Sequence, residues 1–119
     1  MNPVRRARGE LEAQVLHVLW GAGEGLTAKQ IGERLPGAAP APTTVLTALD
    51  RLVAKQHVVR DDRQRGITFR AARTEEQHVS QTMLDQLRTS SNREAALLHF
   101  VGNLADEDAE LLRRSLRRD

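Results

Sequence analysis

The stretch from Pro40 to Lys55 constrains the fold of this chain more than any other, because it has the pattern of one amphipathic helix with two unlike faces. At about 100° per residue, one side gathers the apolar side chains that a helix packs against a core. These are Val45, Leu46, Leu49, Leu52 and Val53. The other side carries Thr44, Thr47, Arg51 and Ala54. Short hydroxyls and an arginine can approach a phosphate or a base edge without steric bulk, so the stretch is predicted to be a DNA-recognition helix.

Two shorter helical patterns precede this stretch. Apolar residues at helical spacing predict a first, core-packing helix over Gly9–Trp20, and the three glycines of Gly21–Gly25 favour a turn after it. Thr27 and Gln30 have the spacing of a capping box, which starts a second helix that ends at Pro36-Gly37. Leu26 is expected to be extended, and Pro42 suits the first position of the recognition helix. This order predicts a helix-turn-helix.

A β-hairpin with a basic tip is predicted next. Val58–Asp62 and Ile67–Ala71 contain β-branched residues, and the loop between them carries Arg63 and Arg65. Beside a recognition helix such a hairpin is a wing, whose arginines can neutralise phosphates. The first 73 residues are therefore predicted to form a winged helix-turn-helix DNA-binding domain, with DNA contacts at Thr43, Thr44, Thr47, Arg51, Lys55, Arg63 and Arg65.

Residues 74–119 are predicted to form a helical dimerisation domain. Thr74 caps a helix with the stripe Val79, Met83, Leu84 and Leu87; Arg93–Val101 is a short helix that is apolar on nearly every side; and Asp106 caps a last helix. Three short helices make a poor core alone, and a second copy would complete it. The residues predicted to lie in the dimer interface are Leu84, Leu87, Leu97, Leu98, Phe100, Val101, Leu112 and Leu116.

Charge and composition narrow the function classes. The first 73 residues hold 12 Lys and Arg against 7 Asp and Glu, whereas the remaining residues hold 6 against 9, an asymmetry that suggests a nucleic-acid footprint at one end. There is no cysteine, which excludes disulfides and thiolate chemistry. The four histidines lack ligand spacing and no catalytic motif is visible, so no metal, no cofactor and no enzyme activity is predicted. The lack of an apolar run of membrane-spanning length makes a cytoplasmic protein without membrane insertion the default.

Four segments resemble the BlaI/MecI-type penicillinase repressors: Gly9–Trp20, Leu26-Thr27, Thr43–Lys55 and Ala96–Val101. The resemblance covers nearly the whole chain, and the Thr-Val-x-Thr-x-Leu-x-Arg-Leu core is fairly specific among winged helices. It implies a fold that is mainly α with a small β-hairpin, and a dimeric repressor bound at inverted-repeat operators. It also implies pairing with a membrane metalloprotease sensor of β-lactams, and an end of repression by cleavage in the dimerisation domain.

Three departures from the family pattern bear on mechanism. The family's scissile bond lies in an Asn-Phe pair, and the matching candidate cleavage site here is His99-Phe100. The copper-responsive branch of the family uses C-terminal cysteines, which this chain lacks. The recognition helix usually ends in Lys-Gly; here Gln56-His57 replaces the glycine, so a left-handed cap residue would carry a strain of about 1 kcal/mol that glycine avoids.

The predicted function is therefore a dimeric bacterial transcriptional repressor that binds double-stranded operator DNA and controls β-lactam-resistance or cell-envelope stress genes. The alternative is a protein-interaction module in which the winged helix is only a scaffold. Proteolysis, ligand binding and partner binding all stay open as the event that ends repression.

Overall fold

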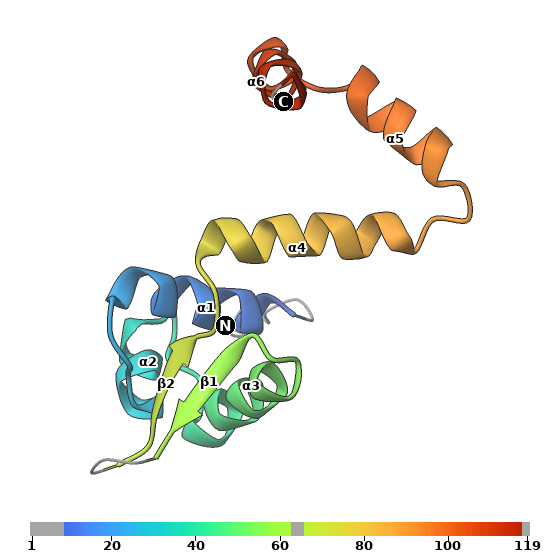
Figure 1. Cartoon of the computed structure of the whole chain (residues 1–119). Helices are drawn as coiled ribbons and strands as arrows, with labels where there is room; N and C mark the ends of the chain where they lie inside the picture. Colours follow the sequence, from blue (N-terminus) through green and yellow to red (C-terminus); the bar gives the residue numbers. More distant parts are fainter. Residues whose placement is uncertain (1–8, 63–65, 118–119) are drawn as a thin grey trace. The chain divides into compact units, whose positions relative to one another are not determined.

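A computed structural model describes residues 9–62 and 66–117 of the chain (Figure 1). Six helices and a two-stranded antiparallel hairpin follow one another along these residues. The elements are α1 (Glu10–Ala22), α2 (Ala28–Arg34), α3 (Pro42–Ala54), β1 (Val58–Asp61), β2 (Thr68–Ala71), α4 (Glu75–Arg88), α5 (Arg93–Gly102) and α6 (Asp106–Leu116). The predicted fold class, mainly α with a small hairpin in a winged helix-turn-helix order, is confirmed.

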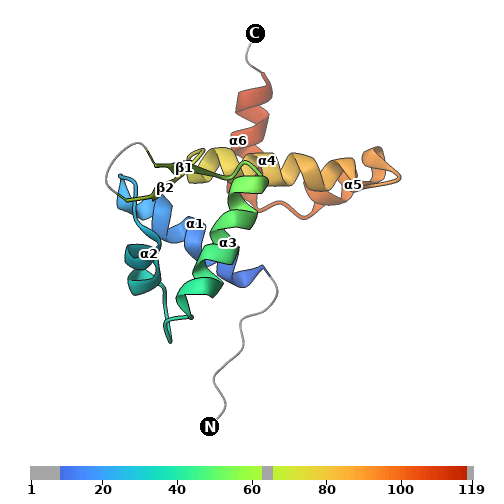
Figure 2. The same cartoon turned by 90° about the horizontal axis from the view of Figure 1, so that it is seen from below.

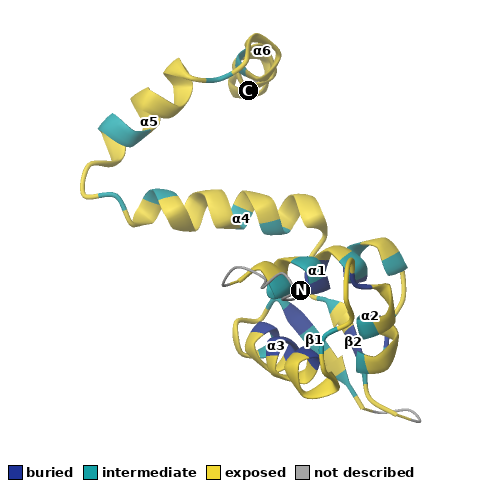
Figure 3. Ribbon diagram, turned by 180° about the vertical axis from the view of Figure 1, so that it is seen from behind, coloured by how far each residue is buried: buried dark blue, intermediate teal, exposed yellow. Residues whose placement is uncertain are grey.

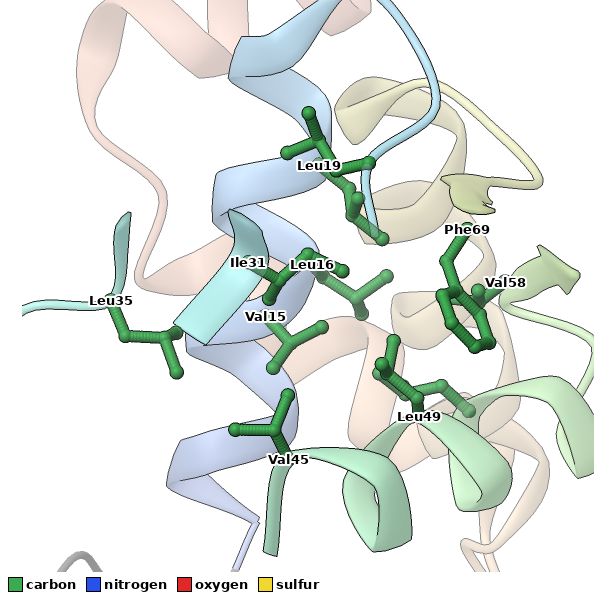
Figure 4. Packing of buried hydrophobic residues seen from close by; sticks show 11 residues of the cluster. Val15, Leu16, Leu19, Ile31, Leu35, Val45, Leu49, Val58 and Phe69 are labelled. Carbon is green, nitrogen blue, oxygen red and sulfur yellow. The ribbon is translucent and has the colours of Figure 1, made fainter. Parts of the chain in front are cut away.

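The chain divides into two compact units, Met1–His78 and Val79–Asp119. In the first unit α1, α2 and α3 surround a common core, with the hairpin closing one side of it (Figures 1 and 2). Figure 4 shows side chains from the three helices and both strands meeting there. The core is aliphatic apart from one phenylalanine, and consists of Val15, Leu16, Leu19, Leu26, Ile31, Leu35, Val45, Leu49, Leu52, Val58 and Phe69.

The ends of α1 and α2 are set by local sequence. Both hydrogen bonds of the predicted capping box form at α2: the Gln30 amide donates to Thr27 Oγ1 at 3.1 Å, and the Thr27 amide donates to Gln30 Oε1 at 2.9 Å. The prediction that α1 ends at Trp20 is wrong, because the helix continues through Gly21 and Ala22. It ends where Gly23 takes a φ of 72°, a left-handed conformation that glycine adopts without strain.

The hairpin forms as predicted, with its strands one residue shorter at the tip than expected. Its register pairs Val58 with Ala71 and Arg60 with Phe69. Leu26 is extended as predicted and forms a single antiparallel β-bridge to Phe69. The Leu26 amide donates to the Phe69 carbonyl at 2.9 Å, and the Phe69 amide donates to the Leu26 carbonyl at 2.7 Å. A Cβ at the preceding Gly25 would lie 3.1 Å from Thr68 Oγ1, so the close approach of this segment to β2 favours glycine.

None of the described residues in α4, α5 and α6 is buried (Figure 3). Helix α4 begins with a second capping box, in which the Gln77 amide donates to Thr74 Oγ1 at 3.2 Å and the Thr74 amide donates to Gln77 Oε1 at 3.0 Å. Asp106 is not the cap of α6 as predicted: Ala105 holds that position, and Asp106 is the first helical residue, where its negative charge suits the helix dipole.

Candidate nucleic-acid interface

Helix α3 presents an outward face of small polar and basic side chains. Thr43, Thr44, Thr47 and Arg51 are all exposed, as the sequence pattern predicted. The Thr47 hydroxyl donates to the Thr43 carbonyl at 2.8 Å, which holds that side chain against its own helix and leaves its oxygen able to accept a hydrogen bond. The major groove of B-DNA is wide enough for an α-helix such as α3, which has 13 residues. Hydroxyl and guanidinium groups on that helix can form hydrogen bonds with the base edges in the groove.

The inward face of α3 fixes how that outward face is presented. Val45, Leu49 and Leu52 are buried in the shared core, and Ala48 is buried with them. Leu46 was predicted to be among these core residues, and the prediction is wrong: its side chain is 43% exposed. It lies at the edge of the buried stripe, so α1 and α2 cover its neighbours and leave it at the surface.

The end of α3 is closed by a Schellman motif. The His57 amide donates to the Leu52 carbonyl at 2.9 Å, and the Gln56 amide donates to the Val53 carbonyl at 3.0 Å. Gln56 takes a φ of 65°, the left-handed conformation expected where the family usually has glycine. Among the described non-glycine residues it alone has a positive φ. The predicted strained cap is therefore present.

Lys55, the last predicted DNA contact on α3, is engaged with α1. Its Nζ lies 2.6 Å from Glu12 Oε1, joining residues 43 positions apart. The lysine side chain remains 54% exposed whereas the glutamate is 17% exposed. A DNA phosphate would therefore compete with Glu12 for this ammonium group.

The two arginines predicted at the wing tip, Arg63 and Arg65, lie outside the described residues. The strands that lead to the tip add two basic side chains that the sequence reasoning did not single out. Arg60 on β1 and Arg70 on β2 are both exposed. Alternation could have indicated Arg70, because it follows the core residue Phe69 in β2. Arg60 pairs with Phe69 across the hairpin, so it lies on the opposite face from Arg70, and no alternation signal marked it.

An aromatic cluster joins the start of α4 to the rest of the first unit. The Trp20 indole lies 5.3 Å from the His78 ring, and the His57 and His78 rings are 4.7 Å apart and perpendicular. Trp20 Nε1 donates to the Arg73 carbonyl at 3.1 Å. Burial lowers the pKa of His57 below its usual value. No group of three or more metal-ligating side chains occurs within residues 9–62 and 66–117.

The apolar residues predicted for dimerisation are uncovered in the single chain. Leu98 is 65% and Leu116 is 84% exposed, Leu87 is half-buried, and the remaining predicted residues, Leu84, Leu97, Phe100, Val101 and Leu112, are exposed. Leu111, 55% exposed, belongs with them although the sequence reasoning left it out. At the candidate cleavage site both His99 and Phe100 are exposed.

Within the part of the chain that the structure describes, every helix is too short or too polar to cross a membrane.

The Penicillinase repressor family model matches residues 8–118. Two proteins named "Transcriptional regulator BlaI", from Mycobacterium tuberculosis strains CDC 1551 / Oshkosh and ATCC 25618 / H37Rv, are each 37% identical to this chain over 114 residues, which cover 91% of this chain and 81% of the relative. This chain belongs to the penicillinase repressor family, a family of transcriptional repressors and not of enzymes.

Proposed function

We propose that this protein is a homodimeric, cytoplasmic repressor that inserts α3 into the major groove of an inverted-repeat operator and blocks polymerase access. The observation that carries the proposal is the division of α3 into a buried apolar face and an exposed face of threonines and Arg51. A recognition helix needs that division, since one face must be held by the core while the other reaches base edges.

The contacts divide by chemistry. Thr43, Thr44, Thr47 and Arg51 lie on the exposed face of α3 and are proposed to meet base edges and adjacent phosphates. Lys55 and the wing arginines Arg63 and Arg65 are proposed as phosphate contacts. Arg60 and Arg70 are also exposed on the hairpin, and they lie on its two opposite faces because Arg60 pairs with Phe69. Phosphate contacts supply affinity and register, whereas base contacts supply sequence preference.

Dimerisation through α4, α5 and α6 is proposed because these helices leave their apolar side chains uncovered in one chain. Charge adds a second argument: α6 begins with Asp106, Glu107 and Asp108 and ends its described part with arginines. Two antiparallel copies would set acids against arginines, which suits a two-fold interface. A two-fold dimer would present two α3 helices to two half-sites about one helical turn, or a multiple of one, apart.

The regulated genes are proposed to be β-lactam-resistance or cell-envelope stress genes, with a membrane metalloprotease sensor as partner. Family membership supports this assignment, and the exposure of His99 and Phe100 makes that bond accessible in the single chain. Histidine at the position of the family's asparagine makes cleavage a separate question from DNA binding.

The test is to recover genomic DNA bound by the purified full-length protein at two salt concentrations. A short inverted repeat, retained at the higher salt and located in promoters, supports the repressor. Genes beside the recovered sites then identify the signal. Binding that is without sequence preference and vanishes at the higher salt would contradict the proposal and favour the protein-interaction module.

A further inference from the structure

The exposed face of α3 has two rims of opposite chemistry. One rim is polar and basic, with Thr44, Arg51 and Lys55. The other carries Leu46 and Asp50, both exposed. Residues four apart on a helix are surface neighbours, so this apolar side chain and this carboxylate form one patch.

The Leu46 and Asp50 rim is unsuited to the DNA backbone. A carboxylate is repelled by phosphates, and a leucine side chain offers them no hydrogen bond. Every other large apolar side chain of α3 is buried or half-buried, so the 43% exposure of Leu46 is an exception within the helix. With α3 in a major groove, the middle of its exposed face meets the base edges and its two rims lie nearest the two phosphate strands. Because phosphates repel the rim with Leu46 and Asp50, we expect the helix to be turned so that this rim lies toward the base edges.

We propose that Leu46 and Asp50 determine operator sequence, Leu46 by contact with a thymine C5-methyl group and Asp50 by accepting a hydrogen bond from a cytosine N4 amino group. These are the apolar group and the amino donor that pyrimidines present in the major groove. The Cβ atoms of residues four apart are separated by about 6 Å. Since base pairs are about 3.4 Å apart, the thymine and the cytosine lie within about two base pairs of one another. This inference rests on the proposed function, and it identifies two base groups that the recognition helix contacts.

The experiment uses the full chain and duplexes carrying the sequence that it selects from random DNA. Each thymine is replaced in turn by deoxyuridine, which lacks only the methyl group. At one thymine per half-site the replacement is expected to weaken binding about fourfold, the value of one buried methyl group. Leu46→Ala should lose a similar factor and become insensitive to that replacement, whereas Leu46→Met, with an apolar side chain of similar volume, should stay sensitive.

For Asp50, selection with Asp50→Asn is expected to lose the preference for cytosine at one position near that thymine. Unchanged wild-type affinity after replacement of every thymine, or full methyl sensitivity in Leu46→Ala, would overturn the role of Leu46. An unaltered selected sequence with Asp50→Asn would overturn the role of Asp50. If the wild-type protein selects no common sequence at all, the proposed function itself fails, and that result is distinct from a selected repeat without methyl sensitivity.

Discussion

Arg51 and Lys55 differ in their interactions within the protein, and so in the energy needed to bring each side chain to DNA. Lys55 already pairs with Glu12 across a 2.6 Å contact, and because Glu12 is only 17% exposed, releasing the lysine costs at least the value of a fully exposed pair, about 0.2–1 kcal/mol. Arg51 is exposed on the face proposed to enter the groove. We therefore expect Arg51 to contribute more to operator binding than Lys55.

Arg51→Ala is expected to weaken operator binding by about 1–3 kcal/mol, because it removes a guanidinium able to contact a base edge. Lys55→Ala is expected to cost less and to lower the salt slope of binding by about one. Fluorescence anisotropy at several salt concentrations measures both. Arg88→Ala, which removes an exposed arginine paired with Asp85 in α4, is the matched control and should leave affinity unchanged. Equal losses from Arg51→Ala and Arg88→Ala would show that only net charge matters.

His57 makes stability depend on pH. Burial is the main cause that lowers its pKa, and positive or titratable neighbours lower it further while one carboxylate opposes them. These neighbours are His78, Arg73, Lys55 and Glu12. Because the folded state binds the proton more weakly than the unfolded state, stability is full above about pH 6.5 and falls as the pH drops through that unfolded value.

The pH dependence is measured by urea unfolding of the wild type and His57→Gln between neutral pH and pH 5. The wild type is expected to lose stability on acidification, and the variant to lose less of it. His99→Gln, at an exposed position in α5, is the matched control and should follow the wild type. A wild-type profile that rises on acidification would contradict the expected sign.

At the scale of one element, α3 ends in a conformation that its sequence does not favour. Gln56 at a φ of 65° carries a side chain where the Schellman motif favours glycine. Gln56→Gly is expected to raise the free energy of unfolding by about 0.5–1 kcal/mol, the left-handed strain less the added chain entropy of glycine. Urea unfolding measures this, and Gln56→Ala, which keeps a Cβ, should show no gain. A destabilised glycine variant would mean that the side chain makes a compensating contact.

Local signals predicted the elements well because they act over a few residues. The capping box at Thr27, the hydroxyl cap at Thr74 and the strained cap after α3 each depend on residues within one turn. Helical periodicity alone could not place Leu46, since its position at the edge of the stripe leaves the decision to neighbouring helices. The pairing of Lys55 with Glu12 likewise depends on how α1 packs, which no local pattern contains.

At the scale of the molecule, the apolar residues of α5 are exposed in the single chain, so the mass in solution tests whether a second copy covers them. Leu98→Asp is expected to shift the protein from a dimer toward the monomer mass of 13.3 kDa, because it would bury a charge in the interface. Its 65% exposure in the single chain means that the fold of one chain does not need the leucine. Sedimentation equilibrium measures the mass.

Ser91→Asp adds the same charge at an exposed position just before α5 and should leave the dimer intact. A wild-type mass equal to one chain would contradict the dimer. The domain boundary predicted after residue 73 stays a prediction at this scale.

Trp20, the sole tryptophan of the chain, gives the molecule an optical probe of its own. Its indole donates to the Arg73 carbonyl and lies beside the His78 ring, so its fluorescence comes from the place where the first turn of α4 packs on the rest of the first unit. Tryptophan emission from an unlabelled sample therefore reports on the surroundings of this one side chain and not on an average over many sites. Titration with operator DNA, dilution or acid can each be read at that junction without attaching a dye.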